Sequence, residues 1–168
     1  MIDSIARKAV DDAFNSLERP FYTERDFVWI CHKEIQKNIN LNNLQQYQIH
    51  YEYPVSGHNE ETEKTYYVDL AIVSEQIKKP ILVIEFKYEP NHSRLDILPS
   101  KLPVVSLNGI FKDLNKIVAI KKTRPEINWL FVLLDEGNHF KDKRELIMEY
   151  CKSFNLEVEN MIIKSDHE

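Results

Sequence analysis

Glycine is scarce in this sequence, which holds only three glycines among 168 residues. Loops that wrap a phosphate in backbone amide groups need glycines at fixed spacing. Neither the G-x-G-x-x-G pattern nor the G-K-[S/T] pattern occurs in the chain. The composition therefore argues against a glycine-rich phosphate-binding loop.

Cysteine and long apolar runs are also scarce. The two cysteines, Cys31 and Cys151, lie far apart and lack C-x-x-C spacing, which favours a reduced, cytoplasmic protein. No signal-peptide pattern and no bilayer-length apolar run is present, so we expect neither secretion nor a membrane partner. The six histidines are scattered and form neither H-E-x-x-H nor a Cys/His zinc pattern. We therefore expect ordinary strand-surface and loop roles for His50 and His58.

Positive charge is in the minority, with 22 lysines and arginines against 27 acidic residues and a net charge of −5. A nucleic-acid-binding protein contacts phosphates through basic side chains, so such a function would need a local basic patch. Two clusters of basic residues could form such a patch, or they could simply be solvated faces of helices. They are Lys112, Lys116, Lys121, Lys122 and Arg124, and Lys141, Lys143 and Arg144.

Apolar periodicity predicts an α/β protein that forms one domain over residues 1–168. The length and a hydrophobic content of 43% suffice for a real core. Helical spacing predicts an extra N-terminal helix over 3–18 and further helices over 23–40, 107–122 and 141–153. Runs rich in β-branched and aromatic residues predict strands over 46–53, 65–73, 80–87, 128–134 and 156–163. We expect a central mixed β-sheet flanked by helices, with loops over 56–64 and 88–106.

Three charged residues lie within two of these apolar runs: Asp69 in 65–73, and Glu85 and Lys87 in 80–87. Charged side chains are rarely buried unless they are paired or bound to a metal. Side chains alternate along a strand, so Glu85 and Lys87 point the same way, about 6.7 Å apart. If the two strands pair through the short link between them, Asp69 lies beside Glu85. Two carboxylates and an ammonium group then converge, which suits a divalent cation and an activated water.

The segment from Asp69 to Glu85-Phe86-Lys87 resembles the D…(D/E)-x-K signature of the PD-(D/E)XK, restriction-endonuclease-like nuclease superfamily. Val68 occupies the place of the proline in the family name. The resemblance implies a restriction-endonuclease-like core in the order αβββαβ. Apolar periodicity alone predicts the same order of helices and strands. Because the periodicity and the signature motif agree, each prediction strengthens the other.

The resemblance also implies a mechanism, metal-assisted hydrolysis of a phosphodiester. Asp69 and Glu85 would hold Mg²⁺ or Mn²⁺, with the backbone carbonyl of Phe86 as a further ligand. Lys87 would orient the attacking water or stabilise charge that develops on the phosphate oxygens. The alternative is a buried carboxylate–lysine pair without catalysis.

A fourth candidate, Glu24, comes from helix geometry. Thr23 is a predicted N-cap, and Asp26 completes a partial capping box. On a wheel of about 100° per residue, Cys31 and Ile35 lie within about 20° of Glu24, at the middle of the predicted buried face. The family resemblance implies an acidic residue from this helix that binds the metal through water or holds a second ion. The alternative is that Glu24 complements the helix dipole.

The predicted function is therefore divalent-metal-dependent phosphodiester hydrolysis, with DNA favoured over RNA as the substrate. Two alternatives stay open: a catalytically silent nucleic-acid-binding domain on the same fold, and a protein-interaction module in which the charges form a salt bridge. The net charge of −5 favours the interaction module. A nuclease domain without a recognition domain can also depend on a homodimer or a partner protein for its substrate.

Overall fold

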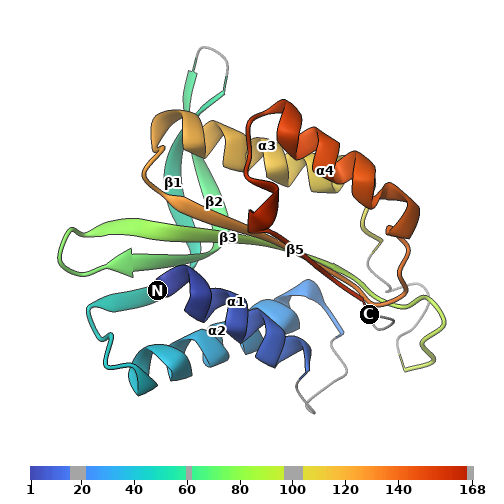
Figure 1. Cartoon of the computed structure of the whole chain (residues 1–168), viewed down its shortest axis with the longest axis horizontal. Helices are drawn as coiled ribbons and strands as arrows, with labels where there is room; N and C mark the ends of the chain where they lie inside the picture. The colour runs from blue at the N-terminus through green and yellow to red at the C-terminus, as the bar shows by residue number, and fades with distance from the viewer. Residues whose placement is uncertain (16–21, 60–61, 97–103, 166–168) are drawn as a thin grey trace.

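A five-stranded mixed β-sheet forms the centre of the molecule (Figure 1). The computed structural model describes residues 1–15, 22–59, 62–96 and 104–165. The strands are β1 (Tyr47–Asn59), β2 (Thr62–Ser74), β3 (Lys79–Glu89), β4 (Asn128–Asp135) and β5 (Met161–Lys164). They lie side by side in chain order, with β1, β2 and β3 antiparallel and β3, β4 and β5 parallel. The predicted α/β class, the mixed sheet and the adjacency of 65–73 and 80–87 are confirmed.

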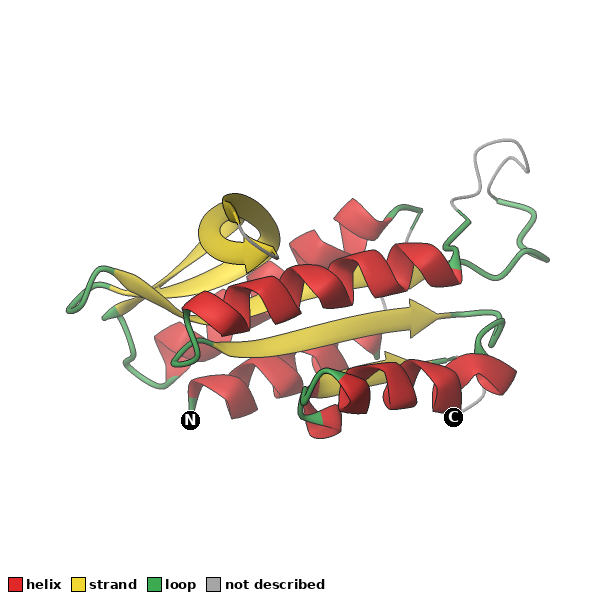
Figure 2. Cartoon of the chain, turned by 90° about the horizontal axis from the view of Figure 1, so that it is seen from above, coloured by secondary structure: helices red, strands yellow, loops and turns green. Residues whose placement is uncertain are grey.

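Helices cover both faces of the sheet and lie along the strands (Figure 2). The helices are α1 (Ile2–Phe14), α2 (Glu24–Leu41), α3 (Leu107–Thr123) and α4 (Arg144–Ser153). Side-chain alternation in β3 divides the core between them, because Ile84 and Phe86 pack toward α1 and α2 while Val83 packs toward α3 and α4. Within the described residues, no helix is long and apolar enough to cross a membrane.

Helix α2 begins where the sequence predicts. The Thr23 backbone N–H donates to Asp26 Oδ2 at 2.8 Å, and Thr23 Oγ1 accepts from the Asp26 backbone N–H at 3.3 Å. This reciprocal capping box is complete. Such a cap satisfies backbone donors that have no partner inside the helix, and it stabilises a helix by about 1 kcal/mol. It also fixes Glu24 as the first helical residue.

Several predicted boundaries differ from the structure. The predicted loop 56–64 is wrong, because β1 continues to Asn59 and β2 starts at Thr62. Gly57 explains the misinterpretation: a Cβ there would lie 2.9 Å from the Ala119 backbone of α3. The glycine permits a close approach of strand to helix and does not mark a turn.

Three further differences lie near the chain ends. A 3₁₀ turn at Lys141–Lys143 precedes α4, and another at Val158–Asn160 precedes the shortened β5. Helix α1 ends at Phe14, and residues 16–18 of the predicted helix lie outside the described residues.

Candidate active site

The predicted charged residues lie where strands β2 and β3 separate. Their pairing ends at Leu70 and Ile84, one residue short of Asp69 and Glu85. Beyond that point the Phe86 backbone N–H donates to Asp69 Oδ2 at 2.7 Å. A carboxylate thus replaces the strand carbonyl that would otherwise accept this hydrogen bond. The Asp69 side chain is tied to β3, and its charge lies near that of Glu85.

Glu85 is almost completely buried, with 1% of its surface exposed. Its Oε2 accepts a hydrogen bond from Lys116 Nζ at 2.7 Å, whereas its Oε1 is buried and has no hydrogen-bond partner among the described residues. Burial raises the pKa of Glu85 to about 9, and the Asp69 carboxylate adds to this rise while Lys116 opposes it. Without a bound cation, Glu85 therefore keeps its proton at neutral pH.

Lys87 lies between two acidic residues from different helices. Its Nζ forms ion pairs with Asp113 Oδ2 at 2.8 Å and with Glu24 Oε2 at 3.3 Å. It also donates to the Phe86 carbonyl, the predicted metal ligand, at 3.1 Å. Burial opposes the Lys87 charge, but Glu24 and Asp113 outweigh it, so the pKa of Lys87 is raised. Lys87 is held as an ammonium ion and is unsuited to act as a general base.

Glu24 reaches the cluster from the first turn of α2, as expected. It lies on the same face of α2 as the buried Phe27, Cys31 and Ile35, as the helix wheel predicts, but its place in the first turn leaves its side chain 36% exposed, at the rim. It reaches Lys87, which lies on β3 three residues beyond the last β2–β3 pair. Burial still raises the pKa of Glu24, and the Lys87 charge partly offsets the rise.

Helix α3 supplies two charged residues that the sequence interpretation did not assign to the site. Asp113 is 8% exposed, and its Oδ1 lies 3.6 Å from Lys116 Nζ. Lys116 also donates to the Tyr67 carbonyl at 3.0 Å. The sequence left two interpretations of Lys116, a phosphate contact or a solvated helix face. In the structure its ammonium group instead points inward and donates to Glu85. The sequence did contain a signal that Asp113 is buried, because it lies at helical spacing between the apolar residues Ile110 and Ile117.

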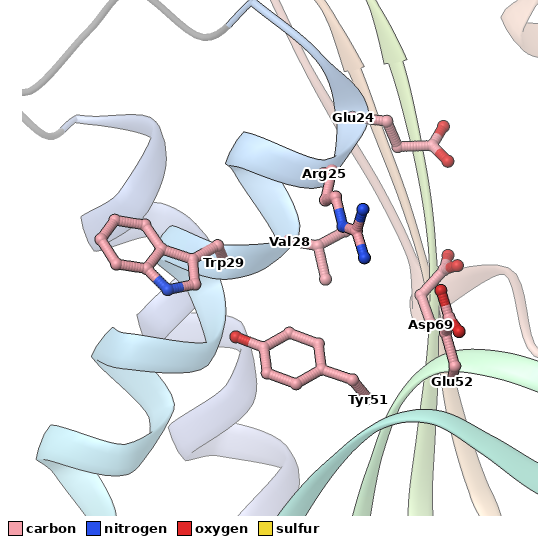
Figure 3. A pocket seen from close by; sticks show the side chains of 7 residues that line it. All are labelled: Glu24, Arg25, Val28, Trp29, Tyr51, Glu52 and Asp69. Carbon is pink, nitrogen blue, oxygen red and sulfur yellow. The ribbon is translucent and has the colours of Figure 1, made fainter.

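A cleft of about 560 Å³ opens beside the cluster, between α2 and the β1–β2 pair. Figure 3 shows the carboxylates of Glu24, Asp69 and Glu52 at one side of this cleft. The rings of Trp29 and Tyr51 lie at the other side, and they are 51% and 44% exposed. Exposed aromatic rings beside a charged cluster suit a planar ligand group that stacks on them.

Glu52 is a further cleft residue that the sequence did not reveal. The β1–β2 register runs from Tyr51 paired with Leu70 to Tyr53 paired with Val68, so Glu52 stands opposite Asp69. Its φ is 43°, in the left-handed region that non-glycine residues rarely adopt. Such backbone conformations cluster at functional sites. Sequence periodicity carries no signal for a local φ of this kind.

Comparisons with family models, with curated proteins and with solved structures found no match to this chain. The likeness of Asp69 and Glu85-Phe86-Lys87 to the nuclease signature thus stays a resemblance of sequence. Function has to be inferred from the side chains of this cluster.

Proposed function

We propose that this chain is a divalent-metal-dependent nuclease with a restriction-endonuclease-like core, and that it hydrolyses phosphodiester bonds in DNA. The observation that carries the proposal is the buried Glu85 carboxylate, whose Oε1 has no hydrogen-bond partner among the described residues. A buried polar oxygen without a partner costs about 1–3 kcal/mol, and more when it is charged. A cation bound at that oxygen would remove the cost.

The charges around Glu85 support a divalent cation. The cluster holds four carboxylates (Glu24, Asp69, Glu85 and Asp113) against two ammonium groups (Lys87 and Lys116), so its ionised form carries a net charge of −2. Oxygen ligands of this kind suit Mg²⁺ or Mn²⁺. Asp69 and Glu85 would hold the ion, with Glu24 at the rim in reach through water. A bound divalent cation polarises a phosphate and lowers the pKa of its coordinated water.

The remaining residues would position the phosphate and neutralise its charge. Lys87 would stabilise negative charge on the phosphate oxygens, and its ion pairs with Glu24 and Asp113 hold it at the site. Asp113 is then a positioning residue, since it acts through Lys87. Lys116 holds Glu85 Oε2 at 2.7 Å, which leaves Oε1 as the remaining acceptor. Trp29 and Tyr51 would stack on unpaired bases in the cleft.

The rival candidate is a protein-interaction module in which these charges are structural. The observations that favour it are the ion pairs of Lys87 and Lys116, which form without a metal, and the net charge of −5. An acidic chain also supports the view that a second copy or a partner protein completes the binding of a nucleic acid.

A cleavage assay combined with cation titration tests the proposal. Wild-type protein, Glu85→Gln and Asp69→Asn are incubated with single- and double-stranded DNA and RNA, in Mg²⁺, Mn²⁺ or chelator. We expect cation-dependent cleavage by the wild type, and loss of both cleavage and calorimetric cation binding in the two variants. Glu145→Gln, an exposed acid on α4, is the matched control and retains both. Wild-type protein with neither cation affinity nor cleavage would support the interaction module instead.

A further inference from the structure

A second group of metal-ligand side chains lies at the carboxyl ends of β3 and β4. Glu89 is the last residue of β3, His92 follows in the next loop, and His139 lies in the turn after β4. One ligand atom from each residue lies within 4.8 Å of those of the other two. His92 Nε2 is 2.5 Å from Glu89 Oε1, and the two imidazole centroids are 4.1 Å apart. The sequence, with its scattered histidines, gave no sign of this convergence.

The Glu89 carboxylate is held in place by the backbone. Its side chain is 2% exposed, and its Oε2 accepts a hydrogen bond from the Val105 backbone N–H. The other oxygen, Oε1, is the one directed at His92. Metal-binding carboxylates and imidazoles are usually oriented by such outer hydrogen bonds. One oxygen of Glu89 is thus fixed, and the other faces the histidines.

The turn that carries His139 is also built for this position. The buried Asp135 carboxylate accepts the backbone N–H groups of His139 and Phe140, both at 2.8 Å. A Cβ at Gly137 would lie 2.1 Å from His139 Nε2. The imidazole therefore occupies the space above Gly137 that a larger residue would fill. Glycine at 137 is what lets the ring fold back toward His92.

The loop that carries His92 is fastened to the same end of β4. Glu136 Oε2 accepts the Asn91 backbone N–H at 3.2 Å and Arg94 Nη1 at 3.1 Å. The Glu136 backbone N–H in turn donates to the Glu89 carbonyl at 2.9 Å. Glu136, which lies between β4 and His139, is therefore hydrogen-bonded both to the end of β3 and to the loop that carries His92. A preorganised site loses less conformational entropy when it binds its ion.

We propose that Glu89, His92 and His139 bind Zn²⁺, with a fourth position open to water or an exogenous ligand. Two imidazoles and one carboxylate form a ligand set found in open tetrahedral zinc sites. Imidazole ligands favour zinc and related transition ions, whereas the all-oxygen cluster around Glu85 favours Mg²⁺ or Mn²⁺. The inference does not depend on the proposed nuclease activity, because the two clusters share no side chain. It assigns the chain two metal positions of different selectivity.

Metal titration of the full chain tests the proposal. Protein freed of metal with chelator is titrated with Zn²⁺ by calorimetry and with Co²⁺ by visible spectroscopy, which reports tetrahedral coordination. We expect one tight Zn²⁺ equivalent and a tetrahedral Co²⁺ spectrum in the wild type. Loss of an outer-shell partner costs roughly 10–100-fold in affinity, so His92→Ala and His139→Ala should lose more than about 100-fold. Gly137→Ala should weaken binding because it displaces the His139 ring.

Two controls separate this cluster from other ligands. His50→Gln removes a histidine of β1 that lies outside the cluster, and it should bind Zn²⁺ as the wild type does. Glu85→Gln should lose Mg²⁺ but keep Zn²⁺. Because His92→Ala leaves the buried Glu89 Oε1 without its 2.5 Å partner, the metal-free variant should melt below the wild type, and Zn²⁺ affinity is therefore measured at a temperature well below both melting temperatures. Wild-type protein that binds no Zn²⁺, or His92 and His139 variants that bind it as tightly as the wild type, would overturn the proposal.

Discussion

At the scale of single residues, Glu85 sets the chemistry of the candidate site. A carboxylate that is 1% exposed is normally paired on both oxygens, yet Oε1 has no hydrogen-bond partner among the described residues. Burial and the neighbouring Asp69 raise its pKa to about 9. Perturbed titratable groups of this kind concentrate at functional sites, because catalysis and metal binding need charges that folding alone does not favour.

The raised pKa makes stability depend on pH. Between the usual glutamate pKa of 4.5 and the raised pKa of about 9, folded Glu85 keeps a proton that the unfolded chain has lost. The folded state binds more protons, so the free energy of unfolding falls as pH rises through this window. We expect the metal-free melting temperature to decline between these pH values more steeply in the wild type than in Glu85→Gln. For a chain of this size 1 kcal/mol corresponds to about 2–4 °C. Parallel curves for the two proteins would contradict the assigned pKa.

Lys87 is expected to serve both activity and stability. Lys87→Ala leaves Asp113, 8% exposed, without its nearest cation and should lower stability by roughly 1–3 kcal/mol. It should also reduce cleavage by orders of magnitude while most of the Mg²⁺ affinity remains. The double variant Lys87→Ala/Asp113→Asn should regain stability without regaining cleavage. If cleavage returned together with stability, Lys87 would have only a structural role.

At the scale of elements, the site exists because four elements, β2, β3, α2 and α3, meet at one place. The β2–β3 pairing stops at Leu70 and Ile84, and α2 and α3 then reach the opening from opposite faces of the sheet. Glu24 enters from the first turn of α2, and Asp113 enters from the second turn of α3. A paired ladder at this point would have closed the space that these carboxylates share.

The capping box of α2 is the element-scale feature most open to test. Thr23→Ala removes a cap and should lower the free energy of unfolding by about 1 kcal/mol. Because the cap fixes the first turn, this variant should also weaken the Glu24–Lys87 contact and reduce cleavage. Asn42→Ala removes a side-chain bond at the far end of the same helix, where Asn42 Nδ2 donates to the Asn38 carbonyl at 2.7 Å, and is the matched control. It should cost similar stability in thermal melts while Glu24 keeps its position. Equal loss of cleavage in both variants would argue against a specific role for Glu24.

At the scale of the whole molecule, charge and architecture point to different partners. The overall charge of −5 disfavours a broad nucleic-acid surface, while the cleft with Trp29 and Tyr51 offers a local one. The cluster of Glu89, His92 and His139 lies where β3 and β4 end, because loops that leave the carboxyl ends of parallel strands come together there, whereas Glu85 lies within β3. Strand β3 thus carries ligand positions of two chemistries, Glu85 and Glu89.

The sequence by itself determined the local features of this protein. Periodicity placed the helices and strands, Thr23 and Asp26 marked the start of α2, and alternation along β3 put Glu85 and Lys87 on one side. These are properties of neighbouring residues, which short-range geometry governs. The wrongly predicted loop at 56–64 shows the limit of short-range geometry. Gly57 is needed there because of a close approach to Ala119, which is distant in the sequence.

Only the tertiary structure decided which side chains meet. Asp113 and Lys116 join the site because α3 packs over β3, and Glu52 joins because β1 pairs with β2. Glu89, His92 and His139 meet because β4 lies parallel to β3 after a long crossover. These approaches depend on the packing of whole helices and sheets, and no spacing of residues along the chain encodes them.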